Sequence, residues 1–368
     1  MTLKPCTFGS YRSNRFVTAC LLVLVTVCAA ANAQDDKLVL DGARRTQVIE
    51  RTLELLRDRY VFPEVGQAMS GLVSGKLTDG AYDSISNPSA LAIALTSDLQ
   101  GLSKDLHLRV SFNPQVSMFE ENQTPEVEAE VNARAAYVNY GFERVERLAC
   151  NVGYIDLRNF HSADLGGPTA IAAMNFVANS NAIIFDLRQN GGGSPEMVQL
   201  ISSYLFGEKS VHLNSLYWRE GESTEEYWTD PKAPGLHCPD VPVFVLTSGR
   251  TFSAAEEFSY NLQSLGRATI VGETTGGGAH PGGSVPVDDQ FAVWIPMGRA
   301  INPITKTNWE GVGVEPEVDV PAHIALEMAH MLAIEGLLGS TGDARVLEEL
   351  ENELISVRER IDKLASGR

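Results

Sequence analysis

The chain has 368 residues, of which 44% are hydrophobic, so it can bury a sizeable core as one large or two modest domains. Its formal net charge of -18 makes nucleic acid and anionic membrane surfaces poor partners. No cluster of Cys and His has metal-ligand spacing and no phosphate-loop pattern is present, so we expect neither a metal nor a nucleotide cofactor.

Residues 1–33 have the pattern of a cleavable signal peptide. A basic beginning is followed by an uncharged apolar stretch over residues 16–30 and by Ala31-Asn32-Ala33, which fits a small-x-small cleavage site. The apolar stretch is short for a membrane span, and a retained anchor is the alternative. We therefore expect a mature chain that starts at Gln34, has no stable membrane span and is periplasmic or secreted.

Residues 34–104 are expected to form a small helical domain. Apolar residues recur at helical spacing between Val48 and Tyr60 and again between Leu91 and Leu99. Proline and glycine interrupt this pattern, so roughly three short helices are predicted. The segment contains no obvious chemistry.

Residues 105–149 are expected to form a strand followed by a connecting segment. The alternation over Asp105–Phe112 is typical of a half-buried strand, with His107 and Arg109 on one face. A lone histidine on a strand is usually structural. Residues 113–148 are polar and acidic, which predicts a surface excursion with a short helix near residues 127–136.

Strands alternate with helices in residues 150–321, and this pattern predicts an α/β core with a largely parallel sheet. The predicted strands cover residues 152–157, 182–187, 241–246, 269–271 and 291–296. Functional sites in such sheets form where strands end and helices begin. Asn190–Gly193 and Ser253 both occupy such positions. The three glycines there either form a flexible turn or present backbone N–H groups to a substrate.

Ser253 lies between a buried strand and the first turn of a predicted helix. Unpaired N–H groups and the positive end of the helix dipole gather at that position. One interpretation is that Ser253 caps the helix, which is a common role for serine. The other is that it acts as a nucleophile, because the charge formed on attack at a carbonyl would lie near fixed donors.

The remainder of the chain contains a glycine-rich loop over residues 272–283, which we expect to be mobile, and two C-terminal helical runs within residues 322–368. An apolar stripe from Val346 to Ile361 is predicted to pack on the core or on a second subunit, which would make a homo-oligomer. Cys150 and Cys238 remain after signal removal, either as a disulfide or as two buried free thiols.

Four motifs occur in a recognisable order, namely Asp186–Gly193, Thr251–Glu256, Gly272–Thr275 and Gly313–Pro316. Together they resemble the serine peptidases that include the tail-specific (C-terminal processing) proteases and the tricorn core. The resemblance covers residues 150–320 and implies a crotonase/ClpP-like layered core. It favours the nucleophile interpretation of Ser253 over the cap.

The branch of this superfamily is indicated by what the chain lacks. Tail-specific proteases use a serine–lysine dyad, and the position that matches their lysine is Gly278. No lysine lies between Lys232 and Lys306, and residues 113–148 are too short to hold a PDZ domain. The chain is more similar to the modules of interphotoreceptor retinoid-binding protein and to tricorn-like peptidases.

The tricorn-type resemblance implies a histidine base from a strand before the core and a glutamate that orients it. These positions match His107 and Glu310, although Leu106 replaces the serine that precedes the tricorn histidine. A base is required because serine is a poor nucleophile at its own pKa. The implied oxyanion hole consists of the N–H of Ala254 and that of Gly192 or Gly193.

Other residues are expected to support this site or to replace one of its members. Glu256 would support the serine turn or cap its helix, while Glu273 and His280 lie in the nearest loop. His280 is the alternative base. The expected function is a serine endopeptidase that cleaves unfolded polypeptides or protein C-termini. The alternatives are a non-catalytic binding module for a retinoid or fatty acid on the same fold, and a hydrolase of non-peptide carboxyl substrates.

Overall fold

The computed structural model describes residues 39–113 and 125–367, so the predicted signal peptide lies outside the described residues. The N-terminal part contains three helices, as predicted: α2 (Gly42–Arg59), α3 (Pro63–Thr78) and α4 (Pro88–Ser103). Asp41 and Asn87 cap α2 and α4 by accepting backbone N–H groups of the first turn, at 2.8 and 2.9 Å. Proline begins α3 and α4, where its missing N–H has no cost.

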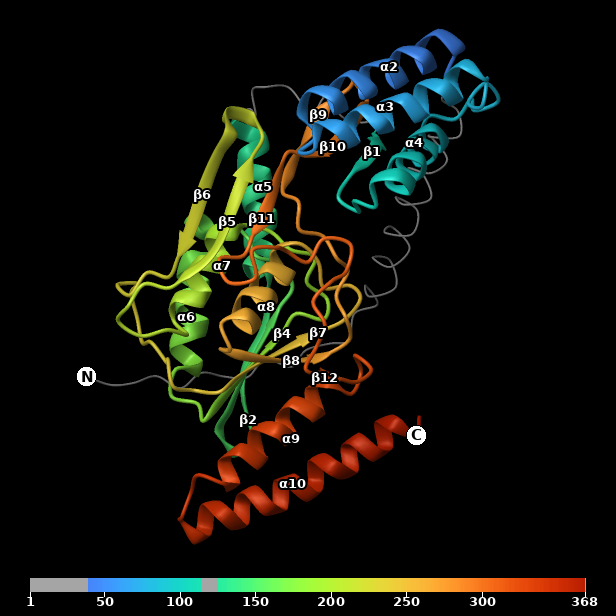
Figure 1. Ribbon diagram of the computed structural model, residues 1–368. Helices are drawn as coiled ribbons and strands as arrows, with labels where there is room; N and C mark the ends of the chain where they lie inside the picture. The colour runs from blue at the N-terminus through green and yellow to red at the C-terminus, as the bar shows by residue number, and fades with distance from the viewer. Residues whose placement is uncertain (1–38, 114–124, 368) are drawn as a thin grey trace, which may run out of the picture.

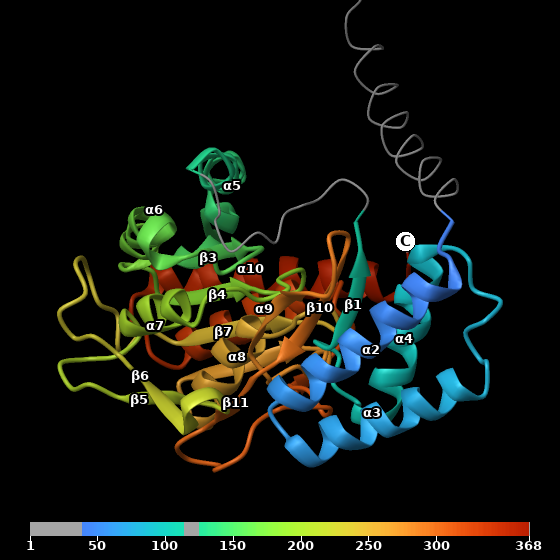
Figure 2. The same cartoon turned by 90° about the horizontal axis from the view of Figure 1, so that it is seen from above.

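A small antiparallel sheet packs against these helices. Strand β1 (Arg109–Phe112) pairs with β10 (Phe291–Pro296), which pairs with β9 (Gly282–Pro286). Side chains from the helices and from this sheet share one hydrophobic cluster, which includes Leu56, Leu95 and Val293. Figure 2 shows β1 and β10 beside α2 and α4. The N-terminal helices are therefore completed by strands from much later in the chain.

The central sheet has six strands in the order β12-β8-β7-β4-β3-β2, and all but the edge strand β2 run parallel to their neighbours. Its strands are β2 (Phe142–Leu148), β3 (Val152–Leu157), β4 (Ala182–Asp186), β7 (Val243–Thr247), β8 (Ala268–Gly272) and β12 (Val318–Asp319). This arrangement confirms the expected α/β core with a largely parallel sheet. The register aligns the carboxyl ends of β4, β7 and β8, so the loops that follow them meet.

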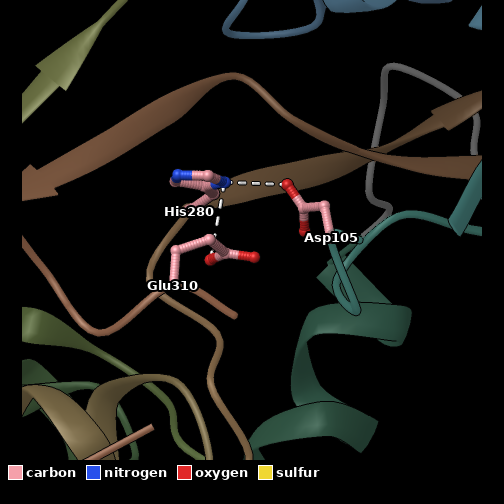
Figure 3. A group of neighbouring side chains, drawn as sticks. All are labelled: Asp105, His280 and Glu310. Atoms are coloured by element: carbon pink, nitrogen blue, oxygen red, sulfur yellow. Dashed lines mark hydrogen bonds and ion pairs between the residues drawn. The ribbon is translucent and has the colours of Figure 1, made fainter. Parts of the chain in front are cut away.

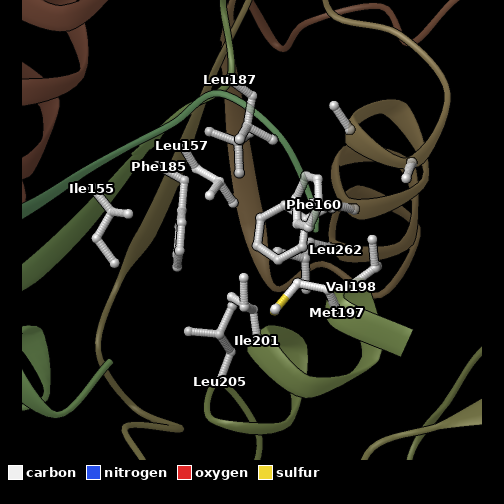
Figure 4. Packing of buried hydrophobic residues seen from close by; sticks show 14 of the residues in the cluster. Ile155, Leu157, Phe160, Phe185, Leu187, Met197, Val198, Ile201, Leu205 and Leu262 are labelled. Carbon is white, nitrogen blue, oxygen red and sulfur yellow. The ribbon is translucent and has the colours of Figure 1, made fainter. Parts of the chain in front are cut away.

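Helices cover both faces of the central sheet (Figure 1). One face packs against α6 (Ala163–Val177), α7 (Pro195–Ser203) and α8 (Ala254–Ser264). Figure 4 shows the cluster there, in which Phe185 of the sheet lies near Ile201 of α7 and Leu262 of α8. The other face packs against α9 (Ala325–Leu338). The core is thus two helical layers around one sheet.

The C-terminal helix α10 (Ala344–Ala365) packs against α9, at the opposite end of the molecule from α2–α4 (Figure 1). Leu350 and Val357 of its apolar stripe are buried there together with Ile334. The stripe therefore packs within this chain, which is the first of the two predicted alternatives.

Several strands were not predicted from the sequence, among them β2, β5 (His212–Trp218), β6 (Ser223–Trp228) and β11 (Gly298–Ile301). β5 and β6 form a hairpin that β11 extends into a sheet. β2 lies in the segment predicted to be a surface excursion, after the expected helix α5 (Pro125–Tyr137). β2 and β6 are edge strands with mostly accessible side chains, so they lack the apolar run of a buried strand. Short 3-10 turns cover Asn139–Gly141, Ala149–Asn151 and Glu220–Glu222.

The strand expected from Asp105 is shorter than predicted and begins at Arg109. The Asp105 side chain accepts the N–H of His107 at 3.1 Å, and this local hydrogen bond makes a turn in place of a strand ladder. Cys150 and Cys238 are both buried free thiols. None of the helices in the described part of the chain is long and apolar enough to cross a membrane.

Candidate active site

Ser253 lies in a strained turn between β7 and α8. Its backbone has φ 56° and ψ -124°, a conformation that only glycine adopts without strain. Ser253 holds the N-cap position of α8 and forms a capping box with Glu256, whose carboxylate accepts the N–H of Ser253. A serine held on a sharp, strained strand-to-helix turn is also the arrangement of a nucleophile elbow. A helix cap ordinarily has an extended backbone, so capping alone does not account for the strain, and presentation of the hydroxyl does.

The Asn190–Gly193 turn is fitted closely to the serine turn. Asn190 is buried, and its carbonyl accepts the N–H of Phe252 at 3.0 Å. Its side-chain oxygen accepts the N–H of Gly192 at 2.8 Å. A Cβ on Gly192 would lie 2.7 Å from the Cβ of Ser253, so glycine is required for this approach. The turn is therefore fixed rather than flexible.

These contacts distinguish the candidate oxyanion donors. The N–H of Gly192 is occupied by Asn190, so it is not available to a substrate. Among the residues that the structure describes, no hydrogen bond occupies the N–H of Gly193 or that of Ala254. Gly193 and Ala254 both line a cavity with Ser253, whereas Gly192 does not. Of the two glycines proposed from the sequence, Gly193 fits the role.

Glu256 joins the serine turn to the glycine-rich loop. One carboxylate oxygen accepts the N–H of Ser253 at 2.8 Å and that of Gly278 at 2.9 Å. The other accepts the Thr275 hydroxyl and the N–H of Gly277, both at 2.6 Å. Burial raises the pKa of Glu256, and these four hydrogen bonds oppose the rise. The loop that the sequence predicted to be mobile is therefore held along residues 275–278.

The last two motifs meet at Thr275. Its hydroxyl accepts the N–H of Val314 at 2.7 Å while donating to Glu256. Glu273, two residues earlier, accepts the N–H of Ala322 at 2.9 Å and so stabilises a neighbouring segment rather than the cavity. All four sequence motifs thus converge on the Ser253 turn.

His107 lies in the turn before β1, and its ring is 4.5 Å from that of Phe252, centroid to centroid. Its Nδ1 is buried without a hydrogen-bond partner. Burial lowers the pKa of His107 to about 4, although the nearby Asp105 carboxylate acts in the opposite direction. The imidazole is therefore neutral at pH 7 and able to accept a proton. The structure has no direct bond from His107 to Ser253 among its described residues, and such bonds often form only around a substrate.

Gly278 lies against both aromatic rings. A Cβ at this position would lie 2.6 Å from Cε1 of His107 and 2.3 Å from Cζ of Phe252. Position 278 matches the lysine of the tail-specific dyad, so the histidine ring occupies the space that a lysine stem would need. His107 and a lysine at position 278 exclude each other in this packing.

Glu310 stays a predicted partner of His107, and among the described residues its Oε1 and Nδ1 of His107 are both buried without a hydrogen bond. It accepts the N–H of Ala279 at 2.5 Å and lies 3.5 Å from Nδ1 of His280 (Figure 3). Burial and the neighbouring Asp105 raise the pKa of Glu310 to about 7, while His280 opposes the rise. The turn that carries Glu310 lies against the loop at Gly277, and one oxygen of its carboxylate is held by that loop at Ala279.

Asp105, which lies two residues before His107, was not predicted as a site residue from the sequence. Its side chain accepts hydrogen bonds from the N–H of His107 at 3.1 Å, from His280 at 2.8 Å and from the Tyr60 hydroxyl at 3.1 Å. Asp105 is fully buried, so these donors satisfy its charge. The signal in the sequence was an acid two residues before the candidate base.

Asp105, His280 and Glu310 have ligand atoms within 4.8 Å of one another, which is a spacing that a metal could use. The same oxygens already accept hydrogen bonds from Tyr60 and Ala279. Donors that point at these oxygens oppose a cation there. The cluster is better described as a hydrogen-bonded network that fixes His280.

Ser253 and His107 line one cavity of about 440 Å³. The rest of its wall is formed by Gly191, Gly193, Arg109, Ser111, Phe252, Ser284 and Trp294. The lining is mixed in polarity, and none of the described residues in it has a carboxylate. The cavity therefore presents a hydroxyl, a neutral imidazole and a guanidinium to one ligand.

A strained serine, a neutral imidazole beside it and two unoccupied N–H groups, on a layered α/β core, define a scaffold of the serine peptidase class. The chain belongs to peptidase family S41. Residues 151–320 match that family, and residues 39–144 match the N-terminal domain of S41 peptidases in eukaryotic IRBP.

Two curated relatives come from Arabidopsis thaliana. The chloroplastic carboxyl-terminal-processing peptidase 1 is 28% identical over 195 residues, which cover 52% of this chain and 38% of the relative. The chloroplastic carboxyl-terminal-processing peptidase 2 is 28% identical over 172 residues, which cover 46% of this chain and 32% of the relative. The chain thus spans about a third of the length of the curated relatives it matches.

Solved structures share the fold at low sequence identity. A protein from Parabacteroides merdae ATCC 43184 has a TM-score of 0.55 at 20% identity, covering 82% of this chain and 98% of its own. A lipoprotein from Streptococcus agalactiae has a TM-score of 0.53 at 13% identity, covering 79% and 96%. The tricorn protease has a TM-score of 0.50 at 14% identity, covering 86% and 37%.

Proposed function

We propose that the chain is a serine endopeptidase that acts outside the cytoplasm on unfolded polypeptides or protein C-termini. The observation that carries this proposal is the strained Ser253, which lines one cavity with the neutral His107. Membership of a peptidase family and similarity to carboxyl-terminal-processing peptidases support it. The signal-peptide pattern of residues 1–33 supports the location.

The reaction would proceed by acyl transfer. His107 takes the proton of the Ser253 hydroxyl as its oxygen attacks the scissile carbonyl carbon. The N–H groups of Gly193 and Ala254 stabilise the oxyanion, and each such donor typically contributes about 3 kcal/mol. His107 then gives the proton to the leaving amine as the C–N bond breaks. Water, activated by the same imidazole, hydrolyses the acyl-enzyme and regenerates the serine.

Asp105 and Glu310 have separate supporting roles in this proposal. Asp105 holds the turn of His107 through the backbone N–H and favours the imidazolium that forms during the reaction. Glu310 holds the loop at Ala279 and faces His280, and so it shapes the wall of the site. In this proposal Asp105 supports the base in addition to the histidine–glutamate pair that the resemblance implies.

Of the two proposed kinds of substrate, unfolded polypeptides and protein C-termini, Arg109 favours the one with a free C-terminal carboxylate. It is an exposed guanidinium in the lining of the cavity that contains the nucleophile, on a chain that is otherwise strongly acidic. A guanidinium binds a carboxylate through paired, charge-assisted hydrogen bonds. Cleavage of peptides with free C-termini should therefore exceed that of the same peptides as C-terminal amides, and Arg109→Met should remove the difference.

The test compares residues 34–368 with the Ser253→Ala, His107→Gln and His280→Gln variants. Casein and a fluorogenic peptide set are the substrates, and circular dichroism checks folding. The proposal expects loss of hydrolysis in the first two variants and retention in the third. If His280→Gln loses hydrolysis and His107→Gln retains it, the general base is His280 and not His107.

The alternative is a binding module for a retinoid or fatty acid. A folded parent that cleaves no substrate in the set would favour it, and titration with a retinoid would follow. The polar lining of the cavity supports the peptidase, because a carrier of an apolar ligand has no need for a hydroxyl, an imidazole and a guanidinium in one wall. Hydrolysis of simple esters without peptides would instead indicate a non-peptide hydrolase.

A further inference from the structure

A second, smaller cavity lies beside Ser253. It has a volume of about 50 Å³, and Gly193, Ser253 and Ala254 form one side of it. Gly193 and Ser253 also line the larger cavity, so the two spaces meet at the nucleophile. A scissile carbonyl bound by the N–H groups of Gly193 and Ala254 would place its own side chain at the entrance of the smaller cavity.

Glu257 lines the smaller cavity and is 5% exposed. It lies one turn of α8 after Ser253, whose carbonyl accepts its N–H at 2.9 Å, so both residues lie on the same face. Its Oε1 has no hydrogen-bond partner. The neighbouring Glu256 is different, because both of its oxygens are saturated by donors.

Two buried amides accompany this carboxylate. Asn214 of β5 is fully buried, and neither its side-chain oxygen nor its nitrogen has a partner. Asn261 of α8 is also fully buried, with an unpaired side-chain nitrogen. Both amides lie within hydrogen-bonding range of the Glu257 carboxylate and lower its pKa against the effect of burial, but neither has the geometry of a formed hydrogen bond. Unpaired polar atoms are rare in folded interiors, so a group of them beside a nucleophile calls for a partner.

The size and lining of the smaller cavity define that partner. A space of about 50 Å³ fits a short side chain better than an aromatic one. Leu216, Ala300 and Trp309 supply apolar wall, and Glu257 supplies the acceptor. A methyl group and a hydroxyl on one short side chain match this combination.

We propose that the smaller cavity binds the side chain of the residue that carries the scissile carbonyl, and that Glu257 selects threonine or serine there by accepting a hydrogen bond from the hydroxyl. This inference rests on the proposed peptidase function and specifies its substrate. Threonine and valine have nearly the same shape, so the hydroxyl is the feature that Glu257 would recognise. A site built around a buried acceptor disfavours the analogue that lacks the hydroxyl, because the acceptor is then left unpaired.

The experiment uses residues 34–368 and peptides that differ only at the residue before the cleaved bond, which is Thr, Val, Ser, Ala or Phe. At pH 8 we expect kcat/KM for threonine to exceed that for valine by about 10- to 100-fold, with serine above alanine and phenylalanine uncleaved. In Glu257→Leu the threonine preference should disappear while the valine peptide is still cleaved. Glu257→Gln, which keeps an acceptor oxygen, should retain part of the preference.

The control is Glu196→Gln, which removes a nearby carboxylate that does not line the smaller cavity. It should keep the parent's ratio of threonine to valine cleavage. If the parent cleaves the threonine and valine peptides with nearly equal kcat/KM, the proposed role of Glu257 is wrong, while the proposed peptidase function is retained. Absence of any cleavage by the folded parent overturns the peptidase and the subsite together. The ratio in the parent requires no variant, so the test does not depend on the folding of Glu257→Leu.

Discussion

Replacing Glu256 with glutamine should disconnect the glycine-rich loop from the serine turn. The carboxylate accepts two hydrogen bonds on each oxygen, three of them from backbone N–H groups. Glutamine has the same shape but only one acceptor oxygen. Whichever way its amide is turned, two donors face an NH2 group instead of an acceptor.

The cost follows from those two donors. A buried donor left without an acceptor costs about 1–3 kcal/mol, so two of them cost about 2–6 kcal/mol of unfolding free energy. The expected orientation keeps Thr275 and Gly277 bonded and releases the N–H groups of Ser253 and Gly278. Activity should fall with stability, because the N–H of Ser253 helps to hold the strained turn.

The matched control is Glu257→Gln, the neighbouring buried carboxylate. Burial raises the pKa of Glu257 from 4.5 to about 7. The folded state therefore binds more protons than the unfolded state between these values, and stability falls as pH rises through that window. Above pH 7 the ionised side chain costs about 3 kcal/mol, so a neutral glutamine should be neutral or stabilising at pH 8.

Urea unfolding at pH 8, followed by circular dichroism, measures both variants. The free energy in water comes from linear extrapolation, with an unchanged slope showing that the same surface is exposed. The reasoning would be refuted if Glu256→Gln were within about 1 kcal/mol of the parent. Equal losses in the two variants would also contradict it, because the structure gives the two carboxylates opposite hydrogen-bonding states.

Three further predictions concern the site itself. Gly278→Ala should reduce kcat at least about 10-fold and lower the Tm, because the added Cβ would lie 2.3 Å from Phe252 and 2.6 Å from His107. Unchanged activity in a folded variant would contradict this packing. As the pH falls, kcat/KM should decrease with a midpoint near pH 4, because burial lowers the pKa of His107. A midpoint near 6.5 would show that the base is exposed. Ser253→Gly should abolish hydrolysis and stabilise the fold by about 1–3 kcal/mol in urea unfolding, because glycine relieves the strained backbone; a less stable variant would indicate that the serine side chain packs favourably.

The sequence was most informative where local chemistry determines local structure. The apolar run before Ser253 and the helical pattern after it predicted a strand-to-helix turn, and the structure has one. The three predicted N-terminal helices are present because their caps and prolines lie within a few residues of each boundary. Edge strand β2 was missed because its apolar residues recur at every third position with two charged residues between them, which is not the alternation typical of a strand.

The part of the site that depends on distant contacts could not be predicted. The partner of Glu310 is decided by how the turn at Trp309 lies against the loop at Gly277, which sequence spacing does not contain. The importance of Asp105 follows from a contact with His280, 175 positions later. Glu257 was overlooked because a carboxylate next to Glu256 on a helix gives no sign of facing a cavity. The proposed pairing of Glu310 with His107 was based on resemblance, and the structure gives the glutamate another neighbour.

The proposed base and the nucleophile belong to different hydrophobic cores. Leu108 and Val110 anchor the turn of His107 in the cluster of the N-terminal helices, while Ala254 and Ala255 anchor Ser253 in the cluster of the central sheet. Each of the two proposed positions is therefore held mainly by its own core, and they meet where the His107 ring packs against Phe252. In evolutionary terms the two roles are separable: a lineage can replace the base, move it to a lysine on the glycine-rich loop, or lose it, without rebuilding the fold that presents the serine.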